Sequence, residues 1–499
     1  MSRWCAPSIR PSGIRHVFLL SGLVIRLGSV ASLAGAEAIA ARSDPYVIPL
    51  RREVHPVRRK DDGEVVSLKT TYSGVIAVGY PEQQEFRVVF DTGSGHMILP
   101  SVKCTSSTCL KHRRYDPTSS GTARSIQLDG TPVAPGERGD AVTIGFGTGQ
   151  ITGEFAREWV CLSAASVPSH LVSQPSPDPI EDKEGGGGKG QVHPQGPCLQ
   201  SHFVQATAMS EKPFDLFAFD GILGLGLRPL ALTEDLSFLT LMSKSDVLGS
   251  SRFGLFLAEG EEESEIAFGE YNQARLLEPL AWVPLKKPEL GYWQIEILAI
   301  RIDGRALDAC SSSSPCNGIL DSGTSHLGVP AAHESDLSDM LTKPAGDVTD
   351  CRRAHAPVVE LQLRGVNLTL HAENYMRQMP LARDVFMGTD SSGLSLQPPR
   401  PRRNSTRLGA SWNYLRRALL SGSFSVPFSE PEGVEDAGQD SFCTPKLMPV
   451  SLPVLGQNAF ILGEPLLHRY YTVFDAEARR AGFGLAKHSK RSLPASAPE

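Results

Sequence analysis

Two short segments of the sequence each place an aspartate between a pair of apolar residues and a glycine turn. The segment VFDTGS at 89–94 recurs in the second half of the chain as ILDSGT at 319–324. Each copy is followed downstream by the same apolar–apolar–glycine element, ILG at 222–224 and ILG at 461–463. This repetition predicts two related β lobes, each of which presents one aspartate on a loop.

The aspartates of these loops, Asp91 and Asp321, could together perform general acid–base chemistry. A carboxylate at the end of an apolar strand is costly to bury unless it accepts hydrogen bonds. The glycine in each loop allows a tight turn in which backbone N–H groups reach the carboxylate, and the hydroxyls of Ser94 and Thr324 can donate to its outer oxygen. If the loops meet, the two like charges cannot both ionise, so the pair shares one proton and titrates as a unit. The ionised member would take a proton from water while the protonated member donates to a substrate carbonyl.

Other interpretations of the two loops are weaker. A single D-[ST]-G triplet is a common turn, but two copies that both follow apolar strands favour a catalytic pair. A glycosidase with two carboxylates does not normally hold both in such loops. A protein that binds peptides without cleaving them would typically have lost an aspartate or the neighbouring hydroxyl, and here both are present.

The elements around the loops have the pattern of β-strands. From Tyr72 onward, short apolar runs alternate with Gly, Pro and Asp, as in strands joined by tight turns. The length of 499 residues suggests two or three domain-sized units. A net charge of -6 argues against a nucleic-acid partner, which would call for a basic surface.

The N-terminus has the pattern of a targeting segment. Arg10 and Arg15 precede an apolar stretch at 17–25, and a run of small residues follows, so we expect a signal peptide at 1–36. A buried helix is one alternative, and an uncleaved anchor is another because Arg26 interrupts the apolar stretch. No later stretch reaches the roughly 18 apolar residues of a spanning helix. We therefore expect the secretory pathway, as a secreted protein or in a lysosome-like or vacuole-like lumen, with no stable membrane span after signal cleavage.

The cysteines fit that compartment. Of nine, Cys5 lies in the targeting segment, and the remaining even set predicts four disulfides. A zinc site is disfavoured because there is no CxxC pair and no histidine at ligand spacing, so we expect no metal and no cofactor. The eight cysteines are Cys104, Cys109, Cys161, Cys198, Cys310, Cys316, Cys351 and Cys443.

Composition suggests how the rest of the chain is divided. Residues 163–200 and 378–440 are poorly periodic and rich in Pro, Ser, Gly or charge, so they are interpreted as surface insertions. The first would lie in an N-terminal lobe at 71–270 and the second in a C-terminal lobe at 271–488, with a tail at 489–499. Cysteines flank both insertions, and a disulfide at each neck would limit the entropy cost of the loop.

Taken in order, these motifs resemble the pepsin-like family of aspartic proteases over roughly residues 70–488. The resemblance implies an all-β, bilobal fold with two β-barrel-like lobes and a substrate cleft between them. It also implies a monomeric aspartic endopeptidase that hydrolyses peptide bonds in proteins or peptides and prefers apolar residues at its primary subsites. The matching segments are FDTGSGHMILPS, TIGFGTGQITG (the flap hairpin), AFDGILGLG, GYWQI, GILDSGTS and AFILGEPLLHRYYTVFDAEARRAGFGLA.

The resemblance implies roles for residues around the aspartates. Thr92 and Ser322 would cross-bond beneath the active site. The residues whose backbone would grip substrate are Gly93, Gly323 and, on the flap, Gly147 and Thr148. The residues that would line subsites beside the scissile bond are Val89, Phe146, Ile222 and Ile319. An ordinary core position is the alternative for these last four, because apolar residues at strand ends are usually core.

The resemblance also implies three disulfide pairings, and a fourth rests only on its position around an insertion. The three are Cys104–Cys109, Cys310–Cys316 and Cys351–Cys443. The fourth is Cys161–Cys198, which flanks the first insertion.

Two positions, Phe146 and Ile98, depart from the family pattern, and His96 could have a functional role. Phe146 stands where the family usually has a flap tyrosine, and Ile98 stands where it often has the tryptophan that bonds that tyrosine. Losing both halves of a polar contact can be nearly neutral, so we expect Phe146 to close over substrate by apolar contact with Ile98 in reach. His96 could tune the aspartates, but an exposed or structural role is favoured.

Residues 37–70 are expected to form a basic arm, within which residues 44–60 are basic and short of core residues. They resemble the propeptides of the family, whose cations pair with acidic groups until acid releases them, so we expect a zymogen. A solvated basic run is the alternative. The sequence also contains glycosylation sequons at Asn367 and Asn404, which support a lumenal location weakly.

Overall fold

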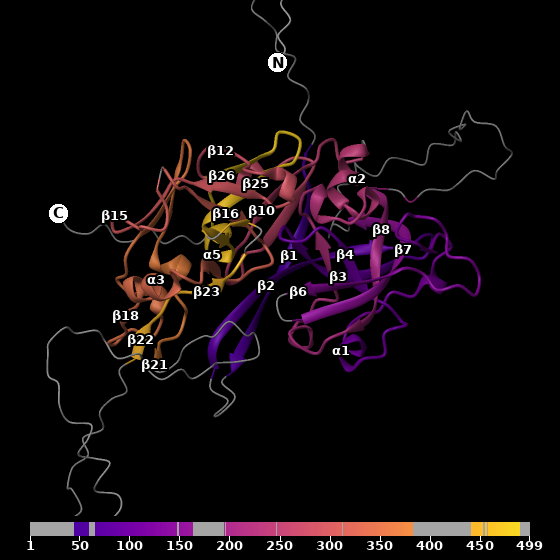
Figure 1. Cartoon of the computed structure of the whole chain (residues 1–499), viewed down its shortest axis with the longest axis horizontal. Coiled ribbons are helices and arrows are strands. Elements are labelled where there is room, and N and C mark those ends of the chain that lie inside the picture. The colour runs from indigo at the N-terminus through magenta and orange to yellow at the C-terminus, as the bar shows by residue number, and fades with distance from the viewer. Residues whose placement is uncertain are drawn as a thin grey trace, which may run out of the picture. The chain divides into compact units, whose positions relative to one another are not determined.

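The computed structural model describes residues 44–58, 65–146, 149–162, 194, 196–245, 247–311, 313–382, 441–452, 455–456 and 458–489. In these residues strands dominate and helices are short (Figure 1), which confirms the expected all-β class. Several features expected from the sequence lie outside the described residues. They are the signal segment 1–36, the flap residues Gly147 and Thr148, the sequon residue Asn404 and most of both insertions.

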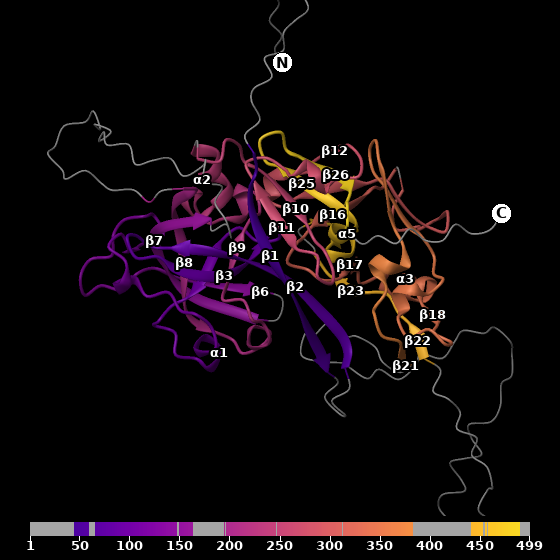
Figure 2. The same cartoon turned by 180° about the vertical axis from the view of Figure 1, so that it is seen from behind.

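A large sheet contains most strands of the first half of the chain together with strands from its end. The order of neighbours is β12-β26-β25-β10-β11-β1-β2-β3-β9-β4-β8-β7-β5, and β6 pairs with β7. Its strands are β1 (Tyr46–Arg58), β2 (Val65–Val78), β3 (Gln84–Asp91), β4 (Met97–Pro100), β5 (Arg124–Ile126), β6 (Ala141–Phe146), β7 (Gly149–Leu162), β8 (Cys198–Met209), β9 (Gly221–Gly224), β10 (Arg252–Phe256), β11 (Ser264–Phe268), β12 (Ala281–Pro284), β25 (Tyr470–Asp475) and β26 (Arg480–Leu485). Figure 2 shows β25 and β26 of the chain's end beside β10 and β11.

Smaller sheets form the second half. One has the order β13-β16-β24-β17-β23, another β15-β14-β19-β20 and a third β18-β22-β21. Their strands are β13 (Gln294–Ile297), β14 (Ala299–Ile302), β15 (Arg305–Ala306), β16 (Cys316–Leu320), β17 (Leu327–Pro330), β18 (Lys343–Pro344), β19 (Val359–Gln362), β20 (Asn367–Leu370), β21 (Leu381–Ala382), β22 (Ser441–Cys443), β23 (Leu447–Val450) and β24 (Ala459–Leu462).

The helices are short connectors between strands. In α2 the side chain of Ser237 caps the helix by accepting from the Thr240 N–H, the usual role of serine at that position. No helix in the described part of the chain has the length and apolar character to cross a bilayer. The helices are α1 (Ser107–Leu110), α2 (Phe238–Lys244), α3 (Glu334–Leu341), α4 (Ala372–Tyr375) and α5 (Glu464–Arg469), with 3-10 turns at η1 (Pro117–Ser119), η2 (Phe214–Leu216), η3 (Arg228–Leu230), η4 (Glu234–Leu236), η5 (Gln273–Arg275), η6 (Pro288–Leu290) and η7 (Cys351–Arg353).

The duplicated sequence motif corresponds to a duplicated strand arrangement. In the first half, β3 pairs in parallel with β9, β4 runs antiparallel to β9, and β4 pairs in parallel with β8. In the second half, β16, β24, β17 and β23 repeat these three pairings in the same order. Each ILG element is therefore a strand with two partners. One partner is the strand that leads into an aspartate loop, and the other is the strand that follows the loop.

A continuous apolar core connects the two halves. The rings of Phe253 and Phe474 are stacked with centroids 4.7 Å apart, and Trp293 meets Phe474 edge-on at 5.0 Å. The buried Trp293 also donates from Nε1 to the carbonyl of Leu225 at 2.7 Å. Since Leu225 directly follows the first ILG element, this bond ties the second half of the chain to the strand beneath the first aspartate loop.

The N-terminal basic segment differs from its expected lack of core residues. Strand β1 pairs with β11 over residues 46–50 and with β2 over residues 51–58. Ile48 and Leu50 are buried in the core. The reason is strand alternation, because every second side chain of a strand points to the same face. The basic residues mark the far end of a strand that begins inside the protein.

All four expected disulfides are present. Cys104–Cys109 and Cys310–Cys316 close short loops, and Cys351–Cys443 joins η7 to β22. Cys161–Cys198 links β7 to β8, where the strand register places the two cysteines opposite each other.

The glycine of each ILG element is required by a close approach of two backbones. A β-carbon at Gly463 would come within 2.2 Å of the Thr324 carbonyl oxygen, and one at Gly224 within 2.5 Å of the His96 nitrogen. Contacts this short cannot be relieved without moving backbone. The glycines therefore let β9 and β24 press directly against the aspartate loops.

We expect the Gly463→Ala substitution to lower the free energy of unfolding by about 1–3 kcal/mol, the usual cost of overpacking. Urea denaturation measures this change. Gly121→Ala is a matched control, since its β-carbon would meet nothing closer than 3.4 Å, and it should change stability by no more than about 0.5 kcal/mol. Equal stability of the two variants would contradict the close-approach argument.

Candidate active site

The two aspartate loops meet, and each packs against the carboxylate of the other. The N–H of Gly93 donates to Asp91 Oδ1 and the N–H of Gly323 to Asp321 Oδ1, both at 2.9 Å. A β-carbon at Gly93 would lie 2.8 Å from Asp321 Oδ1, and one at Gly323 would lie 2.6 Å from Asp91 Oδ1. Any residue other than glycine would therefore push the carboxylates apart.

Reciprocal hydrogen bonds join the loops below the carboxylates. Thr92 Oγ1 donates to the Leu320 carbonyl at 2.9 Å, and Ser322 Oγ donates to the Phe90 carbonyl at 2.6 Å. Each hydroxyl oxygen also accepts from the backbone N–H of the other residue, at 2.9 Å for Thr92 Oγ1 and 3.0 Å for Ser322 Oγ. The serine of the second loop thus forms the same bonds as the threonine of the first.

The two aspartates differ in whether a neighbouring hydroxyl donates a hydrogen bond to the outer carboxylate oxygen. Thr324 Oγ1 donates to Asp321 Oδ2 at 2.7 Å. The corresponding hydroxyl of Ser94 is buried without a hydrogen-bond partner among the described residues. The expected donation from Ser94 to the first aspartate is therefore not made in this structure, whereas that from Thr324 is.

The surroundings of Asp321 favour its protonated form. Burial, followed by the nearby charge of Asp91, raises the pKa of Asp321 to about 7. Hydrogen bonds from Thr324 and Gly323 act in the opposite direction but do not cancel the shift. A carboxyl group that keeps its proton up to neutral pH, beside another carboxylate, is suited to act as an acid.

A further layer of contacts supports the second loop. The N–H of Glu464 donates to the Thr324 carbonyl at 2.8 Å, and Asp321 N–H donates to the Leu462 carbonyl at 3.2 Å. The buried side chain of Glu464 accepts a hydrogen bond from Tyr72 at 3.1 Å and pairs with Lys446 at 3.4 Å. The start of α5 is therefore anchored from both sides.

Apolar side chains surround the loops in two clusters. Val89 and Ile222 pack with Phe219, and Phe146 and Phe217 border that cluster. In the second half, the buried members Ile319, Leu455 and Ala459 pack with the half-buried Leu290, Tyr292 and Leu452. The four apolar residues named from the sequence fall into these clusters. Phe219 and Tyr292 lie within the motifs AFDGILGLG and GYWQI but were not expected at the subsites, and neither was Phe217, which stands two residues before Phe219.

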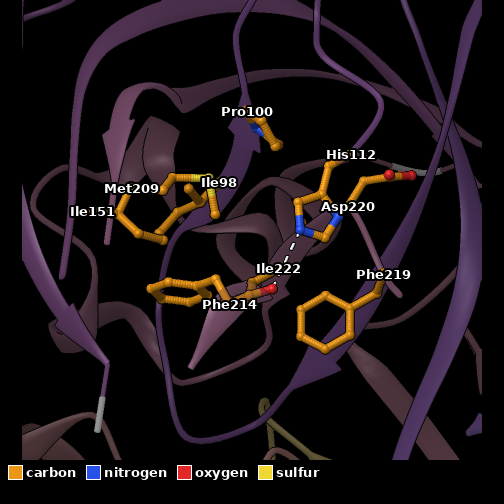
Figure 3. Close-up of a pocket in the computed structure, with 10 residues that line it drawn as sticks. Ile98, Pro100, His112, Ile151, Met209, Phe214, Phe219, Asp220 and Ile222 are labelled. Atoms are coloured by element: carbon orange, nitrogen blue, oxygen red, sulfur yellow. Dashed lines mark hydrogen bonds between the residues drawn. The ribbon is translucent and has the colours of Figure 1, made fainter. Parts of the chain in front are cut away.

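A small apolar pocket of about 10 Å³ lies beside the first cluster. Figure 3 shows its labelled lining, with Phe214 and Phe219 on one side and Ile98 and Met209 on the other. Its acidic residue, Asp220, accepts from the backbone N–H groups of residues 87 and 113 at 3.0 and 2.8 Å. That carboxylate serves the structure of the loop.

The flap residue Phe146 is held by apolar contact. Its ring meets that of Phe214 edge-on, with centroids 6.4 Å apart. It also borders the buried cluster that contains Ile98. The ring partner seen in the structure is thus Phe214, a residue that the sequence analysis did not single out.

His96 has a structural role. Its Nε2 accepts a hydrogen bond from the Leu232 N–H at 3.0 Å, which requires the neutral ring. Burial also lowers the pKa of His96. The structural interpretation favoured from the sequence agrees with this geometry.

Comparisons with known proteins agree with this arrangement. The profile of the eukaryotic aspartyl protease family matches residues 71–181 and 188–391. The chain is 28% identical to cathepsin E of Rattus norvegicus over 339 residues, which cover 66% of this chain and 73% of that protein. It is 28% identical to gastricsin of Mus musculus over 341 residues (67% and 74%) and 27% identical to chymosin of Callithrix jacchus over 357 residues (69% and 81%).

We expect Phe146 and Phe214 to be energetically coupled, by about 0.5–1.5 kcal/mol as for other edge-to-face pairs. A double-mutant cycle with Phe146→Leu and Phe214→Leu, read out by urea denaturation, measures the coupling. A parallel cycle with Phe146→Leu and Ile98→Val should give a smaller value, because no ring contact is lost. Additive effects in the first cycle would contradict the proposed packing of the flap.

Proposed function

This chain belongs to the eukaryotic aspartyl protease family, and on that premise we propose that it is an endopeptidase whose catalytic pair is Asp91 and Asp321. The observation that carries this proposal is the meeting of the two loops, in which each glycine packs against the opposite carboxylate. Intact cross-bonds from Thr92 and Ser322 support it, because they hold both carboxylates in one place.

The proposed reaction divides the two proton transfers between the carboxyl groups. Asp91, as the ionised member, accepts a proton from a water molecule, whose oxygen attacks the carbonyl carbon of the peptide bond. Asp321, as the protonated member, donates its proton to the carbonyl oxygen, which gives a tetrahedral diol. The proton on Asp91 then passes to the leaving nitrogen, the C–N bond breaks, and one hydroxyl of the diol returns its proton to Asp321, which leaves a carboxylic acid and an amine and restores the pair. The raised pKa of Asp321 supports this direction of transfer.

The substrate is a protein or peptide with apolar residues next to the cleaved bond. The two apolar clusters support this preference, because each directly adjoins the strand that leads into an aspartate loop. We propose that Phe146 and the backbone of Gly147 and Thr148 cover the bound peptide from the flap, and that Gly93 and Gly323 contact its backbone. A non-cleaving peptide-binding protein is the rival interpretation.

We propose that the protein enters the secretory pathway as a zymogen and acts as a monomer. Four disulfides support an oxidising compartment. The sequon residue Asn367 is exposed on β20, where a glycan could be attached, although its amide donates to Glu360 at 2.7 Å. Detection of the chain only in the cytosol would contradict the assignment.

We expect Asp91→Asn and Asp321→Asn each to lower kcat for a denatured protein substrate by at least about a hundredfold, because residues that act as a unit fail together. The fold should persist, which circular dichroism would show. Asp129→Asn is a matched control, since Asp129 also lies in an Asp-Gly-Thr turn but is exposed. A variant of either catalytic aspartate that keeps more than about a tenth of the activity would exclude the pair.

We also expect kcat/KM to fall as the pH rises through about 7. The acid must carry a proton, and the pKa of Asp321 of about 7 means that this proton is present below that pH and lost above it. A profile measured from pH 3 to 9 should decline by roughly tenfold per pH unit on the alkaline side. A rate that increases up to pH 8 would contradict the assignment of Asp321 as the acid.

A further inference from the structure

A groove beside strand β20 lies outside the candidate active site. It has a volume of about 410 Å³, within the range of about 300–1,000 Å³ for small-molecule sites. Its lining comes from the segment at 278–281 that leads into β12, from β20 with the residue before it, and from α5, β25 and β26. Segments that are distant in the sequence therefore enclose one space, and neither aspartate loop contributes to it.

One wall of the groove is the edge of a sheet. Strand β20 ends the order β15-β14-β19-β20, so β19 is its only strand partner in the described part of the chain. The other edge of β20 faces the groove, because the N–H of Thr369 donates to the hydroxyl of the lining residue Tyr470 at 2.8 Å. An edge strand can recruit a strand from another molecule, and proteins therefore cover or block such edges.

Asn367 stands at the rim of this groove. It is exposed on β20, and with Leu368 and Thr369 it forms an N-x-T sequon. Its side-chain amide donates to Glu360 on the neighbouring strand β19 at 2.7 Å. A glycan replaces one of the two hydrogens of that amide, so the remaining N–H can keep a bond to the carboxylate. The rigid strand and this bond would together limit the directions in which a first sugar leaves the chain.

The groove offers a sugar both kinds of contact that it uses, because a sugar has apolar ring faces as well as hydroxyl groups. The exposed Pro279 and the half-buried Leu485 supply apolar surface. The exposed Glu278 supplies carboxylate oxygens that accept from hydroxyl groups. The hydroxyl of Thr369 also lines the groove and is oriented by a hydrogen bond from Arg469 at 3.3 Å.

The attachment point favours a glycan over a strand from a second copy of the chain. A glycan on Asn367 begins at the rim, so its first sugars have a high effective concentration in the groove. A strand from solution has no such advantage. It would also have to displace the Tyr470 hydroxyl from the N–H of Thr369 before it could pair with β20.

From this arrangement we propose that Asn367 carries an N-linked glycan whose first sugars lie in the groove and cover the open edge of β20. A glycan at this position would make the edge bulky and soluble. The proposal rests on the secretory route proposed above, because N-linked glycans are attached in the lumen of that pathway. It does not depend on the proposed peptidase activity.

Peptide mass spectrometry of the full chain, expressed in a eukaryotic cell, tests the attachment. A peptide N-glycosidase converts a glycosylated asparagine to aspartate, and we expect this conversion at Asn367. Asp129→Asn is the matched control, because it adds an Asn-Gly-Thr sequon in an exposed turn. A glycan at the added sequon but not at Asn367 would overturn this proposal alone. Absence of a glycan from both positions would overturn it together with the proposed secretory route.

The rate of glycan release tests whether the sugars lie in the groove. For each position the rate of release by the peptide N-glycosidase is measured in the folded and in the urea-denatured protein. We expect folding to slow release at Asn367 at least about tenfold more than at the sequon added by Asp129→Asn, because sugars held in the groove are released only when that region opens. Equal slowing at the two positions would place the Asn367 glycan in solvent and contradict the groove as its site.

Removal of the sequon tests the cover over the edge. We expect Asn367→Gln to self-associate on warming at least about threefold faster than the wild type, measured by light scattering, because the edge of β20 would be open. Thr369→Ser is the matched control, since it changes the same strand but keeps both the sequon and the hydroxyl. Equal rates of self-association in the two variants would refute the role of the glycan as a cover.

Discussion

Two carboxyl groups, one buried and one partly buried, are held against each other, and much of the fold serves this requirement. We propose that the electrostatic cost of this contact is met by sharing a proton, and the raised pKa of Asp321 is consistent with that. The two carboxyl groups must also be held in place, and the internal repeat of the fold does this. The two loops bond to each other through Thr92 and Ser322, and each is backed by a strand whose glycine permits backbone contact. Neither half could complete this arrangement alone.

The symmetry of the backbone does not extend to all side chains. Asp321 receives a hydroxyl hydrogen bond from Thr324, while Ser94 makes none to Asp91. The second loop is also braced by Glu464, which is itself held by Tyr72 and Lys446. A duplicated scaffold thus presents two carboxyl groups in different environments, and such a difference allows one to serve as acid and the other as base.

Local patterns predicted the parts of the structure that depend on residues close in sequence. The aspartate loops, the ILG strands and the all-β class could all be read this way, because turn residues and apolar alternation act over a few positions. The ring that contacts the flap residue Phe146 could not be predicted in this way, because Phe214 lies far along the chain from it. The burial of Ile48 and Leu50 was missed because neighbouring arginines dominate the composition of that strand. Four cationic residues line one cavity only in the folded protein, so no spacing in the sequence marks that cavity; they are Arg52, Arg352, Arg377 and Lys446.

The disulfide Cys351–Cys443 spans a sequence separation of 92 residues and joins η7 to β22. The entropy of closing a loop grows only with the logarithm of its length, by roughly 0.6 kcal/mol for each doubling. Between the two cysteines, β19, β20 and α4 belong to the folded core, whereas the stretch between β21 and β22 begins and ends on paired strands. The disulfide at this neck keeps the cost of lengthening that stretch small. This neck is consequently a graft point, where evolution or an engineer can exchange the stretch between β21 and β22 without disturbing the aspartate loops.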